Sequence, residues 1–231
     1  MSASANSLDI ESFWEYTDPA ASESRFREAL GAAHGDERLE LLTQVARTYS
    51  LRKDFATANA VLDDVEHQLE TAGPRPRARY LLERGRTFNS AGDKEKGRTL
   101  FLRAWELARD SGEEGLAVDA AHMVAITYSG SAAGVEWNQK GLAMARASKA
   151  EKAQALIPAM YNNMAWNLHD LKRHDEALAA FEAALVEWGS RGKPKQIQVA
   201  KWSVAQGLRA LNREKEAAEI EKALEAEGYK P

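Results

Sequence analysis

The chain has 231 residues, of which 44% are hydrophobic and 29% are charged, a balance that suits a folded protein with a core and argues against a wholly disordered chain. Its 31 Lys and Arg residues against 35 Asp and Glu residues give a formal charge of -4, so no basic excess points to nucleic acid or to an anionic membrane surface. The absence of cysteine excludes disulfides, thiolate metal sites and cysteine nucleophiles, and it is compatible with a reducing compartment.

The first part of the chain lacks the basic start and the apolar segment of a secretory signal, and no later stretch approaches about 18 consecutive apolar residues. We therefore expect a cytoplasmic protein that does not enter a membrane. Residues 1–17 are expected to form a flexible leader, although the run FWEY, from Phe13 to Tyr16, places three aromatic side chains within four residues. This run can pack on the next helix as a cap, fill a groove of the same chain, or dock onto another protein.

The first predicted helix begins at the pair Asp18-Pro19, because aspartate caps helices and proline favours their first turn. Its pattern continues to about Ala33, and its apolar face, which includes Phe26, mimics the second helix of a hairpin that has no first helix. We therefore expect an N-terminal half-repeat over residues 18–35.

A five-residue pattern, in which a small residue is followed three positions later by an aromatic residue or leucine, occurs five times in the rest of the chain. The small residues are 39 residues apart in the first interval and 40 in each of the next three, a regularity that chance would rarely produce. We interpret each interval as one structural repeat. The five runs are VARTY (45–49), RGRTF (84–88), VAITY (124–128), MAWNL (164–168) and VAQGL (204–208), and their small residues are Ala46, Gly85, Ala125, Ala165 and Ala205.

Apolar residues at helical spacing mark two helices in each repeat, joined by a short polar turn, so each repeat is predicted to be a helix hairpin. In the third repeat, Gly134, Asn138 and Gly141 fall where the second helix should be buried, which makes this helix the weakest of the pattern. In the fourth repeat, Pro158 either opens the first helix, which we favour, or kinks a longer one. The predicted repeats cover about residues 36–73, 74–112, 113–148, 149–190 and 191–231, which with the half-repeat makes roughly eleven helices.

The repeat resembles the tetratricopeptide repeat, whose first helix carries a large apolar residue, a small residue and an aromatic residue, and whose second helix carries alanine, an aromatic residue and alanine. The fourth repeat matches best, with Ala165 on its first helix and Ala177, Phe181 and Ala184 on its second. The resemblance implies an all-α fold, namely a right-handed α-solenoid of stacked helix hairpins that forms one domain over residues 18–231.

The chain departs from the tetratricopeptide pattern in length and at two positions. The repeats are longer than the usual ~34 residues, which implies longer helices. Arg84 stands where an apolar residue is expected, and Glu221 stands where an aromatic residue is expected. We therefore interpret the fifth repeat as a degenerate end cap.

In the tetratricopeptide family the first helix of each pair lines the concave surface, so the resemblance implies a groove formed by residues beside the packing faces of those helices. Asparagine can pair with peptide groups and tryptophan offers an apolar surface, so such a groove can hold an extended or helical peptide. Alternatively, the tryptophans pack between repeats and the arginines are solvated. The candidate peptide-binding residues are Arg47, Arg86, Asn89, His122, Asn162, Trp166, His169, Trp202, Gln206 and Arg209, with Glu40, Glu83, Asp119 and Asp170 beside them.

The sequence contains no pattern that predicts catalysis or metal binding. His169 and His174 are five positions apart, so on a continuous helix their side chains would diverge, unlike the histidines of an HExxH motif. The stretches GSAAG and GSRGKP follow no predicted strand and lack the spacing of a phosphate-binding loop. We therefore expect no catalytic residue, no metal and no cofactor.

Taken with the resemblance, these observations predict a non-catalytic scaffold or adaptor that binds a protein or peptide in its concave groove and binds neither nucleic acid nor membranes. Two alternatives stay open. One is a regulatory protein that senses a small ligand or a peptide, and the other is a structural module that associates with itself into a homo-oligomer.

Overall fold

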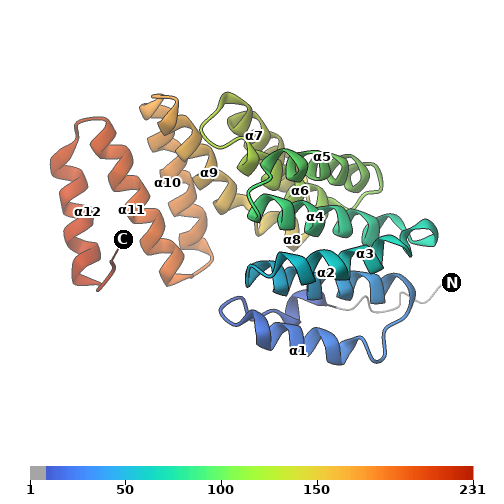
Figure 1. Cartoon of the computed structure of the whole chain (residues 1–231). Coiled ribbons are helices and arrows are strands. Elements are labelled where there is room, and N and C mark those ends of the chain that lie inside the picture. The colour runs from blue at the N-terminus through green and yellow to red at the C-terminus, as the bar shows by residue number, and fades with distance from the viewer. Residues whose placement is uncertain (1–8, 231) are drawn as a thin grey trace. The chain divides into compact units, whose positions relative to one another are not determined.

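The computed structural model describes residues 9–230, which contain helices and no β-strand (Figure 1). The chain divides into two compact units, Met1–Ala120 (unit 1) and Ala121–Pro231 (unit 2), and the division falls within α6 (Glu114–Thr127). Before α6 lie η1 (Ile10–Phe13), α1 (Pro19–Ala29), α2 (Gly35–Leu51), α3 (Phe55–Glu66), η2 (Leu69–Thr71), α4 (Pro74–Ser90) and α5 (Lys94–Asp110). After α6 lie α7 (Ala132–Ala147), α8 (Glu151–Gln154), α9 (Ile157–Asp170), α10 (His174–Ser190), α11 (Pro194–Ala210) and α12 (Glu214–Ala226).

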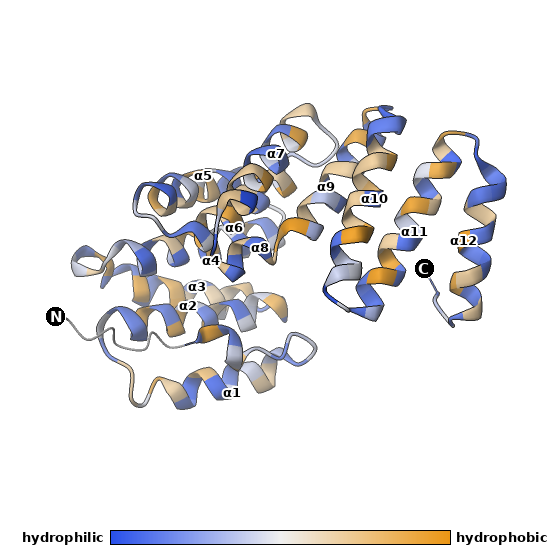
Figure 2. Cartoon of the chain, turned by 180° about the vertical axis from the view of Figure 1, so that it is seen from behind, coloured by the Kyte–Doolittle hydropathy of each residue, from blue (hydrophilic) through white to orange (hydrophobic). Residues whose placement is uncertain are grey.

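Successive helices pack as hairpins, α2 with α3 and α4 with α5 in unit 1, and α9 with α10 and α11 with α12 in unit 2. The first helices of adjacent hairpins also contact each other, α2 with α4 and α9 with α11. Hydrophobic and hydrophilic residues both occur along the long helices, as the colours in Figure 2 show. One face of each helix can therefore be buried while another stays in water. The all-helical fold of stacked hairpins that the sequence predicts is thus confirmed.

The small residue of the repeat pattern is buried in all five repeats. Gly85 shows why it must be small, because a Cβ atom at this position would come within 2.5 Å of the ring of Phe101 on α5. The four alanines at the equivalent positions have no exposed surface. Small residues here let the two helices of a hairpin approach closely, and the large side chains fill the space beside them.

Replacing Ala165 with leucine should destabilise the protein by roughly 1–3 kcal/mol, because the added atoms have no space between α9 and α10. Urea denaturation followed by circular dichroism measures the loss. The matched control is Ala218 to leucine on α12, where the side chain is exposed and should be tolerated. Equal stability of the two variants would show that Ala165 does not lie at a close helix contact.

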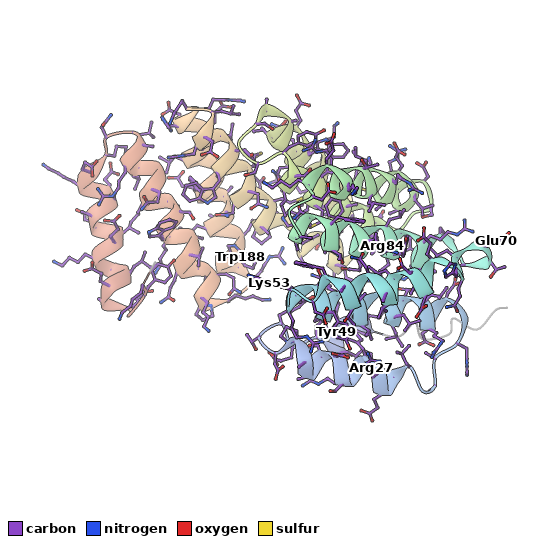
Figure 3. All side chains as sticks on the ribbon, viewed as in Figure 1. Arg27, Tyr49, Lys53, Glu70, Arg84 and Trp188 are labelled. Carbon is purple, nitrogen blue, oxygen red and sulfur yellow. The ribbon has the colours of Figure 1, made fainter. Side chains whose placement is uncertain are left out.

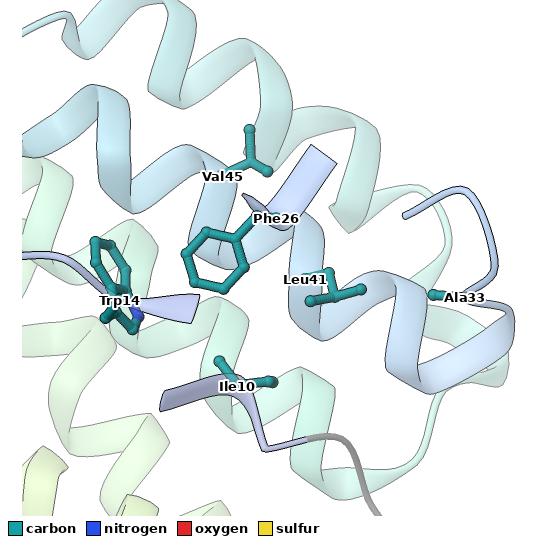
Figure 4. Packing of buried hydrophobic residues seen from close by; sticks show 6 residues of the cluster. All are labelled: Ile10, Trp14, Phe26, Ala33, Leu41 and Val45. Atoms are coloured by element: carbon teal, nitrogen blue, oxygen red, sulfur yellow. The ribbon is translucent and has the colours of Figure 1, made fainter. Parts of the chain in front are cut away.

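Residues 9–17, which the sequence assigns to a flexible leader, instead form η1 and pack on α1 and α2. Ile10 and Trp14 are buried in one cluster with Phe26, Leu41 and Val45 (Figure 4). The ring of Trp14 meets that of Phe26 edge-on, with the centroids 5.1 Å apart. The segment therefore gives α1 the apolar packing that a first helix would otherwise provide. Residues 1–8 of the leader lie outside the described part of the chain.

Helix α1 begins as predicted, since the Asp18 carboxylate accepts hydrogen bonds from the N–H groups of Ala20 and Ala21. It ends at Ala29 rather than near Ala33. A polar cluster holds it to α2, in which the Tyr49 hydroxyl donates to Glu23 over 2.6 Å and Arg27 donates to the Tyr49 oxygen over 3.0 Å (Figure 3). The half-repeat is thus fixed by polar contacts on one side and by the aromatic segment on the other.

The two uncertain places of the pattern are resolved by close contacts. Gly134, Asn138 and Gly141 are all buried on α7, and a Cβ atom at Gly141 would lie 2.7 Å from the sulfur of Met160 on α9. The third repeat therefore has its second helix, with small residues where α9 approaches. Pro158 lies in the first turn of α9, and a separate short helix, α8, precedes it, so the favoured prediction is confirmed.

The two departures from the apolar pattern are explained by ion pairs. The guanidinium of Arg84 is largely buried and meets the carboxylate of Asp63 and, over 2.8 Å, the side-chain oxygen of Asn59 on α3 (Figure 3). On α12, Glu221 pairs with Arg209 of α11 over 2.6 Å. In both hairpins a charged pair thus joins the helices where an apolar contact was expected.

Candidate functional site

In unit 1 the predicted groove arginines have partners within the chain. Arg86 donates to Glu83 over 2.6 Å and to both oxygens of Asp119 over 2.6 Å, and Arg47 lies 3.5 Å from the same Glu83 carboxylate. Burial would lower the pKa of the Arg86 guanidinium, but the carboxylates of Asp119 and Glu83 outweigh burial and hold that pKa above its usual value. Because its charge is already balanced, Arg86 is a poor anchor for an additional anion.

The N-terminal segment covers the groove-facing side of α2. The indole N–H of Trp14 donates to the Gln44 side-chain oxygen over 3.1 Å. The Arg47 guanidinium lies 5.2 Å from the ring centroid of Trp14 and 5.7 Å from that of Tyr16, within the range of cation–π attraction. Asn89, the third candidate in unit 1, lies against α5, since a Cβ atom at Gly97 would come within 3.1 Å of the Asn89 Cβ.

In unit 2 an open cleft of about 330 Å³ lies beside α9 and α11. Its volume is within the range of small-ligand and peptide side-chain pockets. Two of the predicted site residues, His122 and Asn162, line it. The full lining consists of His122, Ala159, Asn162, Asn163, Trp188, Lys195, Gln196, Val199 and Ala200.

The polar groups at the cleft are oriented by hydrogen bonds. Asn162 accepts a hydrogen bond from Ser203 Oγ of α11 over 3.3 Å through its Oδ1 atom. Asn163 Nδ2 lies 2.9 Å from His122 Nε2, so with the amide as donor the imidazole is neutral and carries its proton on Nδ1. Below these residues, the Asn167 amide ties α9 to the preceding turn, because its Oδ1 accepts from the Gly130 N–H over 2.6 Å. The asparagines of α9 are therefore held in place.

Trp166 and Trp202 lie together on the same two helices, one turn along from the cleft. Their ring centroids are 5.9 Å apart, and Trp166 also meets the buried ring of Phe181 edge-on at 4.9 Å. Both tryptophans are partly exposed. The structure thus combines the two sequence-based alternatives for Trp166, because one edge packs inside the hairpin while part of the ring is accessible.

The expectation that His169 and His174 diverge is wrong, because it assumed one continuous helix. His169 belongs to α9 and His174 begins α10, and the turn between them brings the ring centroids to 5.2 Å. His169 also meets the ring of Trp166. Even so, residues 9–230 hold no group of three or more His, Asp or Glu side chains placed to bind a metal ion.

The last two candidates face α12. Arg209 hydrogen-bonds Glu221 over 3.0 Å and also pairs with Glu214. Arg209 is the main cause, with a smaller contribution from Gln206, of a pKa of the Glu221 carboxyl below its usual value. Gln206 and Arg209 thus already have polar partners within the fifth hairpin.

Sequence reasoning missed Trp188, Lys195 and Val199. Trp188 is near the C-terminal end of α10, a second helix, and the search for groove residues covered only first helices (Figure 3). The other two could have been found, because Lys195 and Val199 precede Trp202 at helical spacing on the same face of α11. The prediction had placed the start of that face one turn too late.

No protein-family model and no curated protein sequence matches the chain.

Solved structures, in contrast, match it over nearly its whole length. BtubC (BKLC) from P. vanneervenii is 14% identical, with a TM-score of 0.72 over 97% of this chain and 94% of that one. NprR in complex with its cognate peptide NprX is 14% identical, with a TM-score of 0.53 over 87% of this chain and 72% of that one. A STAND protein with a tetratricopeptide repeat sensor, from Pyrococcus horikoshii, is 16% identical, with a TM-score of 0.74 over 91% of this chain and 34% of that one. The fold is tetratricopeptide-like.

In a tetratricopeptide-like fold, α9 and α11 are the first helices of their pairs, so the cleft and the two tryptophans lie on first helices, as the resemblance implied. At identities of 14% to 16% the similarity concerns the fold and not the ligand. None of the helices in the described residues combines the length and apolar character that a membrane crossing needs.

Proposed function

We propose that this chain is a non-catalytic binding protein that holds a peptide, or an extended segment of a partner protein, on the α9–α11 face of unit 2. The observation that carries the proposal is that one cleft offers oriented amide groups next to an apolar surface. Peptide ligands need both, since the backbone must be hydrogen-bonded and the side chains give the affinity. The similar fold of NprR, which was solved with its cognate peptide, supports a ligand of this class.

The two adjacent asparagines suit a peptide backbone. The Oδ1 atom of Asn162 is engaged by Ser203, which leaves its Nδ2 group as a donor with no partner among the described residues. Asn163 is engaged through Nδ2 with His122, which leaves its Oδ1 atom as an acceptor. A donor and an acceptor side by side on α9 can pair with the C=O and N–H groups of an extended segment.

The apolar part of the cleft suits a large side chain. Trp188 lines one side, while Val199, with 45% of its surface exposed, lies on α11. An apolar side chain of the ligand would cover both, and aromatic anchors of this kind often carry much of the binding energy. The segment would continue along the same helices toward the Trp166–Trp202 pair.

The arginine end of the originally predicted groove has a smaller role in this proposal. Arg47 and Arg86 are engaged by Glu83, Asp119 and the N-terminal segment, and a ligand would have to displace those contacts. A regulator that senses a peptide would use the same unit 2 cleft, whereas a self-associating module would not need it.

The test is to select peptides from a random 12-residue phage library on the whole protein and to measure the selected peptides by fluorescence anisotropy. Trp188 to alanine should weaken binding by at least about 1–2 kcal/mol, the usual range for an interface tryptophan. Asn162 to alanine should also weaken it, because the ligand backbone loses a partner.

The matched control is Glu182 to alanine, an exposed position on α10 that should bind normally. Melting temperatures show whether any variant has lost its fold instead of its contact. Selected peptides that bind Trp188→Ala and wild type equally would rule out the cleft as the peptide site.

A further inference from the structure

The cleft has an uneven charge that bears on its ligand. None of its lining residues is an aspartate or glutamate, and Lys195 is the lining residue with a permanent positive charge. Two positions earlier, Lys193 precedes the first turn of α11. Neither lysine has an ion-pair partner among the described residues, unlike most arginines of the chain. A ligand carboxylate would therefore meet two cations and no opposing charge.

The neighbouring charges do not cancel this excess. Arg191, in the same loop, donates to the Gln154 carbonyl over 2.8 Å and lies 3.8 Å from Glu187. Glu187 is thus engaged with an arginine and leaves the two lysines unbalanced. Lysines on a mobile stem gain from a nearby carboxylate when no internal carboxylate competes for them.

The apolar surface and the charge lie close together. Trp188 and Lys195 both line the same cleft, and Val199 is one helical turn from Lys195. A ligand that covers Trp188 and Val199 with an apolar side chain therefore places its neighbouring residues beside the lysines. The amide groups of Asn162 and Gln196 add hydrogen-bonding capacity without adding charge.

We propose that the unit 2 cleft selects segments in which an apolar side chain is followed or preceded closely by a carboxylate. This inference rests on the proposed peptide-binding function and names its ligand class. The carboxylate can belong to an aspartate or glutamate side chain or to the C-terminus of the partner. Both sources have the same chemistry at the lysines, so the experiment has to separate them.

The experiment repeats the peptide selection on three forms of the whole protein, namely wild type, Lys193→Met/Lys195→Met, and Lys215→Met/Lys222→Met. The last form is the matched control, because it removes two exposed lysines of α12. Wild type and control should enrich peptides with an acidic residue within about two positions of a large apolar one, the reach of neighbouring residues in an extended segment. The Lys193→Met/Lys195→Met form should keep the apolar preference and lose the acidic one.

Synthetic peptides then give the size of the effect. The glutamate peptide should bind wild type about ten times more tightly than its glutamine analogue, since two exposed ion pairs each contribute a modest amount. This difference should shrink in the Lys193→Met/Lys195→Met form and at high salt. A free C-terminal carboxylate compared with an amide at the same position identifies the source.

The two proposals fail in different ways. If glutamate and glutamine peptides bind wild type equally, and both lose affinity in Trp188→Ala, the acidic ligand class is overturned while the peptide-binding cleft stands. If no selected peptide distinguishes wild type from Trp188→Ala, the cleft itself is overturned. A tenfold preference that persists in the Lys193→Met/Lys195→Met form would show that other residues read the carboxylate.

Discussion

Replacing Trp14 with alanine is expected to destabilise unit 1 by about 3–5 kcal/mol, the usual cost of removing a large aromatic side chain from a core. Trp14 is only 9% exposed, and its indole packs against Phe26 and donates to Gln44. The substitution removes the packing and leaves the buried amide of Gln44 without one of its partners. Hydrogen exchange measured by mass spectrometry should show the loss first in α1 and α2.

The neighbouring Tyr16 provides the control, because it stacks on Trp14 but is 54% exposed. Tyr16 to alanine should cost far less than Trp14 to alanine. Trp14 to phenylalanine should lie between the two, since it keeps the ring packing and loses the N–H donor. Similar exchange rates in all three variants and wild type would mean that the segment contributes nothing to the core of unit 1.

Replacing Arg86 with methionine is expected to cost about 3–5 kcal/mol, because it leaves buried carboxylates without their cation. Glu83 is 2% exposed and has Arg86 within 2.6 Å, and Asp119 is held by the same guanidinium. Methionine keeps most of the side-chain volume, so the loss would be due to charge. Urea denaturation followed by circular dichroism gives the size of the effect.

Removing the stranded charges should rescue the variant. The triple variant Glu83→Gln/Arg86→Met/Asp119→Asn should regain most of the lost stability, because no unpaired charge stays buried. Arg98 to methionine is the matched control at an exposed position of α5. If the triple variant is no more stable than Arg86→Met, the cost of the single change comes from packing and not from charge.

The fold could be predicted because its signal is periodic and local. Each of the five small positions sits at a close helix contact, and a contact of this kind tolerates so few residues that it recurs in the sequence. The register even held in the third repeat, where glycine at positions 134 and 141 weakens the helical pattern but permits the approach of α9. Helix ends were less certain, as the early end of α1 at Ala29 shows.

The candidate site was harder to predict because groove residues are identified by what they do not contact. A sequence pattern finds the stripe beside the packing face, and it found His122, Asn162, Trp166 and Trp202 in this way. It could not show that Arg86 is consumed by two carboxylates from different helices, since such pairs depend on the tertiary fold. It also could not show that Trp188, from a second helix, reaches the cleft.

The polar contacts that begin at Trp14 have a consequence for the synthesis of the chain. Gln44, which accepts from Trp14, also donates to Glu83 over 3.4 Å, and Glu83 is joined through Arg86 to Asp119. Repeat proteins can in general add stability one neighbour at a time as they leave the ribosome. Here the segment that emerges first acquires its complete set of partners only after α6 has begun to form. The nascent N-terminal repeats would therefore stay open to proteases and chaperones until about half of the protein has been made.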